Sequence, residues 1–463
     1  MTNNESIHNL MDTIQRSMDE LQVEIKPEKL ESVVCLLYYS LKPHGRFFHS
    51  IKHALDLTVE GQPLISLTAL FHDLIYYQID GGFHHLVQPL IEPLIYEQSS
   101  AEGTLGVVYL REDLDSQDPL MKLNLHIFDF QPGQVLNPYG GLNEFLSSIV
   151  MSYTFKDLLS ITQLARMIVY LEGTIPFRGP DQHDRDYFHT LAERYAQINQ
   201  EMKLGETEDT LREAIQQAVS LANRDVANFA EVDARDFLDN TWDLIPETNL
   251  SLRQNELYTL RDYRVALQKM SGFFSFLNPS HVYHQYQDSP SDEHLSALTQ
   301  RAINNVDIAR EYLSVKLITS SILDAFATLS GGDAPICLFM GELPRGGSRT
   351  IRLEDFLPTI NTSNRARLDP HVWQLLDTGR NKESIFDIKN APLSLLTYSK
   401  CSAEELSLIS DATQELICGN RNAYDLIALI PHGLREDIGC ALAKMVPTRR
   451  AQLKELLHKI SEA

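Results

Sequence analysis

Hydrophobic residues recur at every third and fourth position along most of this chain, a spacing that places them on one face of an α-helix. Near the N-terminus the pattern predicts helices over 5–21, 27–41, 46–59, 63–77 and 83–97. Farther along it predicts helices over 143–152, 156–172, 184–202, 207–230, 251–276, 292–328 and 402–417, followed by two shorter helices over 434–446 and 449–460. The sequence therefore predicts an all-α protein.

The helical pattern weakens between residues 98 and 142. Glycine, proline and short runs of β-branched and aromatic residues there predict a long excursion with short β-strands. A second stretch rich in glycine and proline, residues 330–356, is the best candidate for a linker. These breaks predict three regions, which span residues 1–240, 241–330 and 331–463.

The composition is that of an ordinary globular protein, with 43% hydrophobic and 22% charged residues. The net charge of −23 predicts repulsion from nucleic acids and from anionic membranes. No run of apolar residues approaches the roughly 20 that a membrane helix needs, so we expect no membrane span. Five scattered cysteines without a CxxC pair, and an N-terminus without the pattern of a secretory signal, predict a cytoplasmic protein.

Two predicted helices carry histidine in an otherwise apolar setting, in "RFFHSIKHALDL" and "TALFHDLIYYQID". His49 and His53 are four residues apart, which places both on one face of a helix. His72 is followed directly by Asp73, so the two side chains converge only if the carboxylate reaches around the helix. Imidazole and carboxylate groups are common ligands of divalent metals, and this grouping predicts a metal site.

A further ligand is predicted in "AVSLANRDVANFAEV", residues 218–232, where Asp225 stands among apolar residues. A buried aspartate is costly unless it is paired or bound to a cation. The neighbouring Arg224 offers an ion pair as the competing explanation. With His53, His72 and Asp73, Asp225 completes the predicted ligand set of a mononuclear or binuclear site for divalent metal, which could be Mn, Mg, Fe, Co, Ni or Zn.

In this order, His53, His72–Asp73 and Asp225 resemble the H…HD…D pattern of the HD-domain metal-dependent phosphohydrolase superfamily. "FHSIKHALDL" is similar to the histidine-pair helix of cyclic-nucleotide phosphodiesterases and small bacterial HD hydrolases, and "ALFHDLIY" to their HD helix. The resemblance covers about residues 30–235. For that part of the chain it implies an HD-type helical bundle, with His49 as the general acid; the C-terminal helical region, predicted from the helical pattern, lies outside the resemblance.

The resemblance implies hydrolysis of a nucleotide or another small phosphoester, by a phosphohydrolase or phosphodiesterase that uses metal-activated water. An HD-type di-iron oxygenase and a non-catalytic HD regulatory or binding module remain alternatives. The oxygenase would need further histidine ligands, for which the candidates are His84, His85, His126, His183 and His189. The long C-terminal helices are candidate contacts of a homodimer.

Substrate-binding residues are predicted in "YLEGTIPFRGPD", which interrupts a helix before the Asp225 helix. Arg178 could bind a phosphate through its two-pronged guanidinium, with Glu172 as a supporting acid. The alternative is a loop held by a surface pair between Arg178 and Asp181. Asn143 is interpreted as a helix N-cap. Arg46 is a weaker phosphate candidate, and Asp80 is a candidate to hold a metal-bound water.

Overall fold

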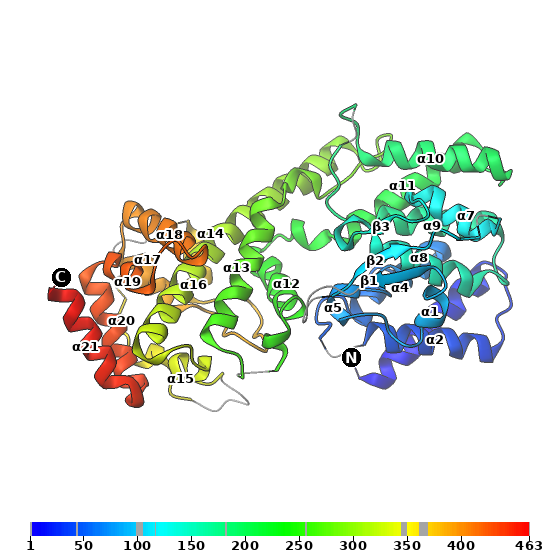
Figure 1. Ribbon diagram of the computed structural model, residues 1–463. Helices are drawn as coiled ribbons and strands as arrows, with labels where there is room; N and C mark the ends of the chain where they lie inside the picture. Colours follow the sequence, from blue (N-terminus) through cyan, green and yellow to red (C-terminus); the bar gives the residue numbers. More distant parts are fainter. Residues whose placement is uncertain are drawn as a thin grey trace. The chain divides into compact units, whose positions relative to one another are not determined.

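The structure is a computed structural model that describes residues 2–42, 45–98, 105–115, 117–180, 183–254, 257–343, 350–360 and 369–462. Helices make up 67% of the protein, beside one small three-stranded sheet in the described ranges. The prediction of an all-α protein is therefore confirmed (Figure 1).

The chain divides into two compact units. The first comprises Met1–Ala230 together with Asn278–Ala302, and the second comprises Glu231–Leu277 and Ile303–Ala463. These units differ from the predicted regions, because the chain leaves the first unit near residue 230 and re-enters it at 278. We call Asn278–Ala302 the return segment.

The helices of the first unit precede the return segment, and the strands lie among them. They are α1 Asn3–Glu20, α2 Pro27–Leu41, α3 Ile51–Asp56, α4 Pro63–Phe71, α5 Tyr77–Asp80, α6 Gln88–Ile91, β1 Ile95–Gln98, β2 Val107–Leu110, α7 Pro119–Phe128, β3 Val135–Leu136, α8 Leu142–Phe155, α9 Ile161–Gly173, α10 Tyr187–Met202 and α11 Glu208–Asp225.

Helix α4 lies at the centre of the first unit. It packs against α1, α3, α8, α9 and α11, and its side chains are buried from Ile65 to Phe71. Its sequence, "PLISLTALF", is apolar on every face, as expected for a helix with neighbours all round (Figure 1). Burial of each large apolar side chain contributes about 1.5–3 kcal/mol. The helix therefore gives a rigid support to the residues that follow it.

Two helices near the N-terminus are shorter than the sequence predicts. The predicted helix 46–59 is reduced to α3, which begins at Ile51 because Ser50 has an extended backbone. The predicted helix 63–77 ends at Phe71, and α5 follows after a turn. His49 therefore precedes α3 instead of sharing a helical face with His53, and Asp73 lies beyond the end of α4.

The predicted helix 83–97 is wrong. Only Gln88–Ile91 is helical there, and Pro93 prevents the helix from continuing because it has no N–H to donate and its ring clashes with the preceding helical turn. The chain then forms β1, which pairs antiparallel with β2, and β2 pairs antiparallel with β3. Strands were predicted in the excursion 98–142, where β2 and β3 lie; the same region also contains α7, which the sequence pattern did not predict.

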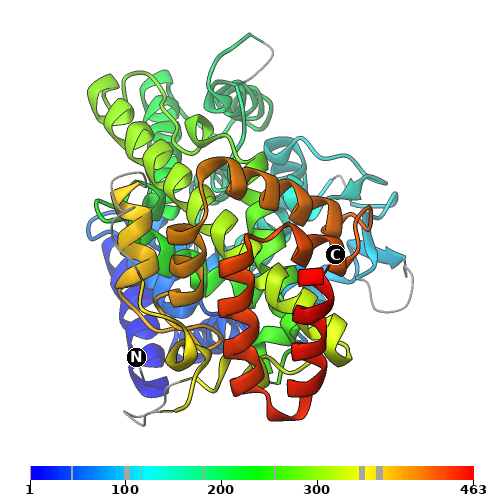
Figure 2. The ribbon, with the colours of Figure 1, turned by 90° about the vertical axis from the view of Figure 1, so that its left-hand side faces the viewer.

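The second unit is built from helices. They are α12 Ala234–Glu247, α13 Leu260–Phe276, α14 Asp292–Gly331, α15 Ile336–Met340, α16 Pro370–Asp377, α17 Pro392–Lys400, α18 Ala403–Ile417, α19 Ala423–Leu429, α20 His432–Met445 and α21 Arg450–Glu462, with the first residues of α14 belonging to the return segment. Figure 2 shows α20 and α21, drawn in red, side by side, and the two helices pack against each other.

Helix α14 is long and apolar enough to cross a membrane by length and composition, contrary to the sequence-based expectation. However, 83% of its most apolar 18-residue window is buried inside the protein. The core helix of a soluble protein has the same property, so this helix is weak evidence for a membrane span.

A charged pair lies in the core of the second unit. Lys316 on α14 places its Nζ 2.6 Å from Asp387 Oδ2, and both side chains are at most 5% exposed. The indole of Trp242 donates to the same carboxylate at 2.9 Å. The Lys316 ammonium also lies 5.5–5.9 Å from the ring centres of Trp242, Tyr263 and Tyr312. Each charge is therefore compensated inside an aromatic environment.

Candidate metal centre

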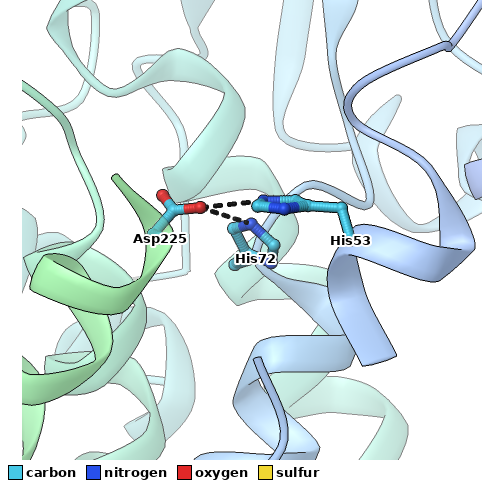
Figure 3. Close-up of side chains that lie close together, drawn as sticks. All are labelled: His53, His72 and Asp225. Atoms are coloured by element: carbon cyan, nitrogen blue, oxygen red, sulfur yellow. Dashed lines mark hydrogen bonds and ion pairs between the residues drawn. The ribbon is translucent and has the colours of Figure 1, made fainter. Parts of the chain in front are cut away.

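Three helices bring histidine and aspartate together in the first unit. His53 lies on α3, His72 directly follows α4, and Asp225 is the last residue of α11. Asp225 Oδ1 lies 2.9 Å from His53 Nε2 and 3.3 Å from His72 Nε2 (Figure 3). One ligand atom from each residue falls within 4.8 Å of the others, a spacing that could hold a metal ion.

Asp73 borders this group. Its Oδ2 lies 2.8 Å from His72 Nε2 and 3.8 Å from His53 Nε2. Asp225 therefore pairs with two histidines, while Arg224, the competing partner in the sequence, donates its Nε to the carbonyl of Ser220.

The ring of His72 is oriented for metal binding. Its Nδ1 lies 2.7 Å from the carbonyl of Ala69, and because a carbonyl only accepts, Nδ1 carries the proton. In the neutral ring, the lone pair of Nε2 then faces Asp73 and Asp225. His72 Nε2 and Asp73 Oδ2 are both buried without a hydrogen-bond partner of acceptable geometry, despite their short distance. Such atoms call for an explanation, and a cation between them would supply one.

Electrostatics lead to the same conclusion. Burial alone would lower the pKa of His72, but the charges of Asp73 and Asp225 raise it well above its usual range. Burial alone would raise the pKa of Asp73, but the charges of His72 and His49 hold it well below its usual range. The carboxylates thus attract positive charge to this point, and either a proton on His72 or a metal ion could supply it. The residues present fit a divalent cation.

His49 lies beside the candidate ligands without joining them. Its ring packs edge-on against Tyr76, with ring centres 4.6 Å apart, and lies 6.2 Å from the ring of His53. Its charge lowers the pKa of Asp73, so the two residues interact electrostatically. This position is compatible with the predicted role of His49 as a proton donor, which stays a prediction.

Arg46 holds the backbone around Asp73. The side chain is fully buried and forms a two-pronged pair with Asp80, with N···O distances of 2.9 and 2.6 Å. It also donates to the carbonyls of Asp73 at 2.6 Å and Leu74 at 3.3 Å. Arg46 was a candidate for phosphate binding and Asp80 for holding water, but their mutual pairing gives both a structural role.

Replacing Arg46 by lysine should loosen this turn. Lysine keeps the charge but lacks the planar fork, so it cannot satisfy Asp80 and both carbonyls together. We expect a loss of about 1–3 kcal/mol in unfolding free energy and weaker binding of Mn²⁺. Urea unfolding and calorimetric titration measure the two effects. An R46K protein with unchanged metal affinity would show that Arg46 does not position Asp73.

Arg178 and Glu172 belong to a buried polar group near this centre. Glu172 is fully buried, and its Oε1 accepts from Arg178 Nη1 and Arg194 Nη2, each at 2.7 Å, and from the hydroxyl of Tyr187. Burial alone would raise the pKa of Glu172, but the two arginines hold it below its usual range. Glu172 thus orients Arg178, whose alternative partner, Asp181, lies outside the described residues.

A third carboxyl group, Glu144, lies in the first turn of α8. Burial raises its pKa to about 7, repulsion from Asp73 and Asp225 adds to this effect, and Arg178 opposes it. Glu144 Oε2 is buried without a hydrogen-bond partner. The sequence offered a weak signal, an acid in the apolar helix "NEFLSSIV".

Asn143 is not the N-cap, a position that Gly141 occupies; its amide oxygen instead accepts from the backbone N–H of Tyr77 at 3.0 Å.

Glu144→Gln should change how stability depends on pH. The folded protein holds a proton on Glu144 that the unfolded chain releases above pH 4.5, so this residue lowers stability as pH rises from about 4.5 to 7. In the presence of a chelator, the E144Q variant should therefore exceed wild type in stability by about 2–3 kcal/mol at pH 8 and differ little from it at pH 4.5. Urea unfolding at both pH values tests this, with exposed Glu28→Gln as the control. Equal pH dependence in wild type and E144Q would contradict it.

The other predicted histidines make contacts elsewhere. The rings of His84 and His85 lie against each other, tilted by 45°, with centres 4.2 Å apart. His126 Nε2 meets the carbonyl of Arg194 at 3.1 Å, and the ring of His189 packs on Tyr286. Within the described ranges, the cluster with metal-like spacing contains none of them, nor His183.

Comparisons of the chain with protein-family models, with curated proteins and with solved structures find no match. Functional inference for this chain therefore depends on the geometry of its own residues.

Proposed function

We propose that this chain is a metal-dependent phosphohydrolase with an HD-type centre. The observation that carries the proposal is the convergence of His53, His72 and Asp225 within 4.8 Å, beside two buried polar atoms that lack a hydrogen-bond partner. His53, His72, Asp73 and Asp225 would hold one divalent cation. Such a cation, when bound, lowers the pKa of water and provides a nucleophile for phosphoester hydrolysis at neutral pH.

The chain's own residues would bind the substrate and move the protons. Arg178, held by Glu172 and stacked on the ring of Tyr187 at 3.9 Å, has the guanidinium geometry that suits phosphate oxygens. His49 would donate a proton to the departing oxygen. A small phosphorylated substrate such as a nucleotide fits this arrangement better than a polymer, because the net charge of −23 repels nucleic acids.

The contacts of the remaining histidines favour a single cation. A di-iron oxygenase would need extra histidine ligands, but His84, His85, His126 and His189 contact one another, carbonyl groups or aromatic rings. Against a non-catalytic module, His72 Nε2 and Asp73 Oδ2 are buried 2.8 Å apart without a hydrogen bond of acceptable geometry, an arrangement that a bound cation would satisfy.

The test combines elemental analysis with an activity panel. The purified protein would be stripped with a chelator, reloaded with Mn²⁺, Mg²⁺, Co²⁺ or Ni²⁺, and assayed on aryl phosphate mono- and diesters, nucleoside monophosphates and cyclic nucleotides. We expect about one ion per chain and metal-dependent release of phosphate or alcohol. Protein that binds no ion, or that binds one and cleaves none of these classes, would refute the proposal.

A further inference from the structure

The return segment lies against the helix end that carries Asp225. Asn223 on α11 forms two hydrogen bonds with the backbone of His284: its Nδ2 donates to the carbonyl at 2.8 Å, and its Oδ1 accepts from the N–H at 2.9 Å. Asn223 is two residues from Asp225. The side-chain amide of Asn223 thus forms one donated and one accepted hydrogen bond with the same residue, as a neighbouring β-strand would. This pair of bonds fixes the position of the return segment along α11.

Tyr283 holds the same helix end from the next position. Its hydroxyl lies 3.1 Å from the carbonyl of Val226 and 3.3 Å from that of Ala227, directly after Asp225. Val226 is the C-cap of α11, and Ala227 begins the 3-10 turn Ala227–Ala230, in which the N–H of Phe229 donates to the carbonyl of Val226. The Tyr283 hydroxyl is a further donor to the carbonyls of Val226 and Ala227, so it fixes the backbone directly after Asp225, and Tyr283 is 4% exposed.

The segment is also fixed to a second helix of the first unit. Asp186, the N-cap of α10, accepts from the backbone N–H of Gln285 at 3.2 Å and lies 3.1 Å from His284 Nδ1. Helix α10 packs against α11. Residues 283–285 therefore join the start of α10 to the end of α11, and their position does not depend on α11 alone.

We propose that the return segment is a positioning element of the metal site: Asn223–His284 and the Tyr283 hydroxyl hold Asp225 where it meets His53 and His72. The inference rests on the proposed function, because it assumes that these residues bind a cation. Metal sites tolerate ligand displacements of only about 0.2–0.5 Å. His72 and Asp225 both lie at helix ends; buried α4 supports His72, and the return segment would give the corresponding support to Asp225.

The experiment compares two contacts of the return segment, one at the end of α11 after Asp225 and one within α11 at a distance from it. Tyr283→Phe removes one oxygen beside Asp225. The matched control, Gln216→Ala, removes the bond from Gln216 Nε2 to the carbonyl of Gln287, 3.1 Å long and about 13 Å along α11 from Asp225. Both are made in the full chain and measured by calorimetric titration with Mn²⁺ and by amide hydrogen exchange, with thermal midpoints to compare global stability.

We expect Y283F to weaken Mn²⁺ binding by about tenfold, the low end of the effect of losing support for a ligand. Exchange should accelerate at residues 222–226, while Q216A keeps wild-type affinity to within twofold. Equal Mn²⁺ affinity of Y283F and wild type, or equal losses in both variants, would overturn the inference alone. Wild-type protein that binds no divalent cation would overturn the proposed function and this inference with it.

Discussion

Replacing both His72 and Asp73 by alanine should leave the protein unable to hold a divalent cation and unable to hydrolyse phosphoesters. The two side chains supply two of the four candidate ligands, and their facing atoms, His72 Nε2 and Asp73 Oδ2, are buried 2.8 Å apart. Loss of groups that merely support a ligand already costs 10–100-fold in metal affinity in known sites. Loss of two ligands should therefore weaken Mn²⁺ binding by more than about 100-fold, which calorimetric titration and elemental analysis would measure.

The control for this double variant is His84→Ala. It also removes a histidine of the first unit, but the ring of His84 lies against that of His85 and is outside the cluster. It should bind metal as wild type does. Because His72 is only 2% exposed, alanine there leaves a cavity, so His72→Gln with Asp73→Asn serves as a second variant of similar volume. Retention of one ion per chain by either double variant would refute the ligand assignment.

Lys316→Met should strongly destabilise the second unit. It leaves the carboxylate of Asp387 buried with the Trp242 indole but without its cation, and breaking a buried ion pair from one side costs about 3–5 kcal/mol. Both tryptophans of the chain, Trp242 and Trp373, are buried in this unit. Their fluorescence during urea unfolding therefore reports on the second unit by itself.

A double variant, Lys316→Met with Asp387→Asn, separates the contribution of the ion pair to stability from that of the packing around it. Removing both charges should recover most of the lost stability, because no uncompensated charge stays buried. The H72A/D73A protein should show the same tryptophan transition as wild type, since its changes lie in the other unit. If the Lys316→Met and double variants were equally unstable, the loss would come from packing and not from the ion pair.

Local signals predicted those helices that begin with clear chemistry. Helix α2 has the predicted bounds 27–41, with Pro27 at its first turn, and α4 begins at Pro63 as predicted. Prediction failed where one residue outweighed the periodicity, as Pro93 did in 83–97. The sequence also did not predict that the return segment belongs to the first unit, because a helical pattern does not say which unit a helix packs into.

In the candidate site, too, the sequence predicts the candidate ligands but not the contacts from distant residues that support them. Residue types and their order were enough to predict that His53, His72, Asp73 and Asp225 come together. The support of these residues was not predictable in this way. From the sequence, Arg46 is a weak candidate to bind phosphate, and only the fold shows that it pairs with Asp80, 34 positions later. The raised pKa of Glu144 likewise depends on neighbours from other helices.

The order of synthesis gives the return segment a further consequence. The candidate ligands have all left the ribosome once Asp225 has emerged, but Tyr283, which holds the end of that helix, follows later. At 5–20 residues per second this interval is at least about 3 s. During this interval the nascent chain contains all the candidate ligands, but the end of α11 lacks its contact with Tyr283. Asp225 would gain this support only when the chain, after beginning its second unit, returns to the first.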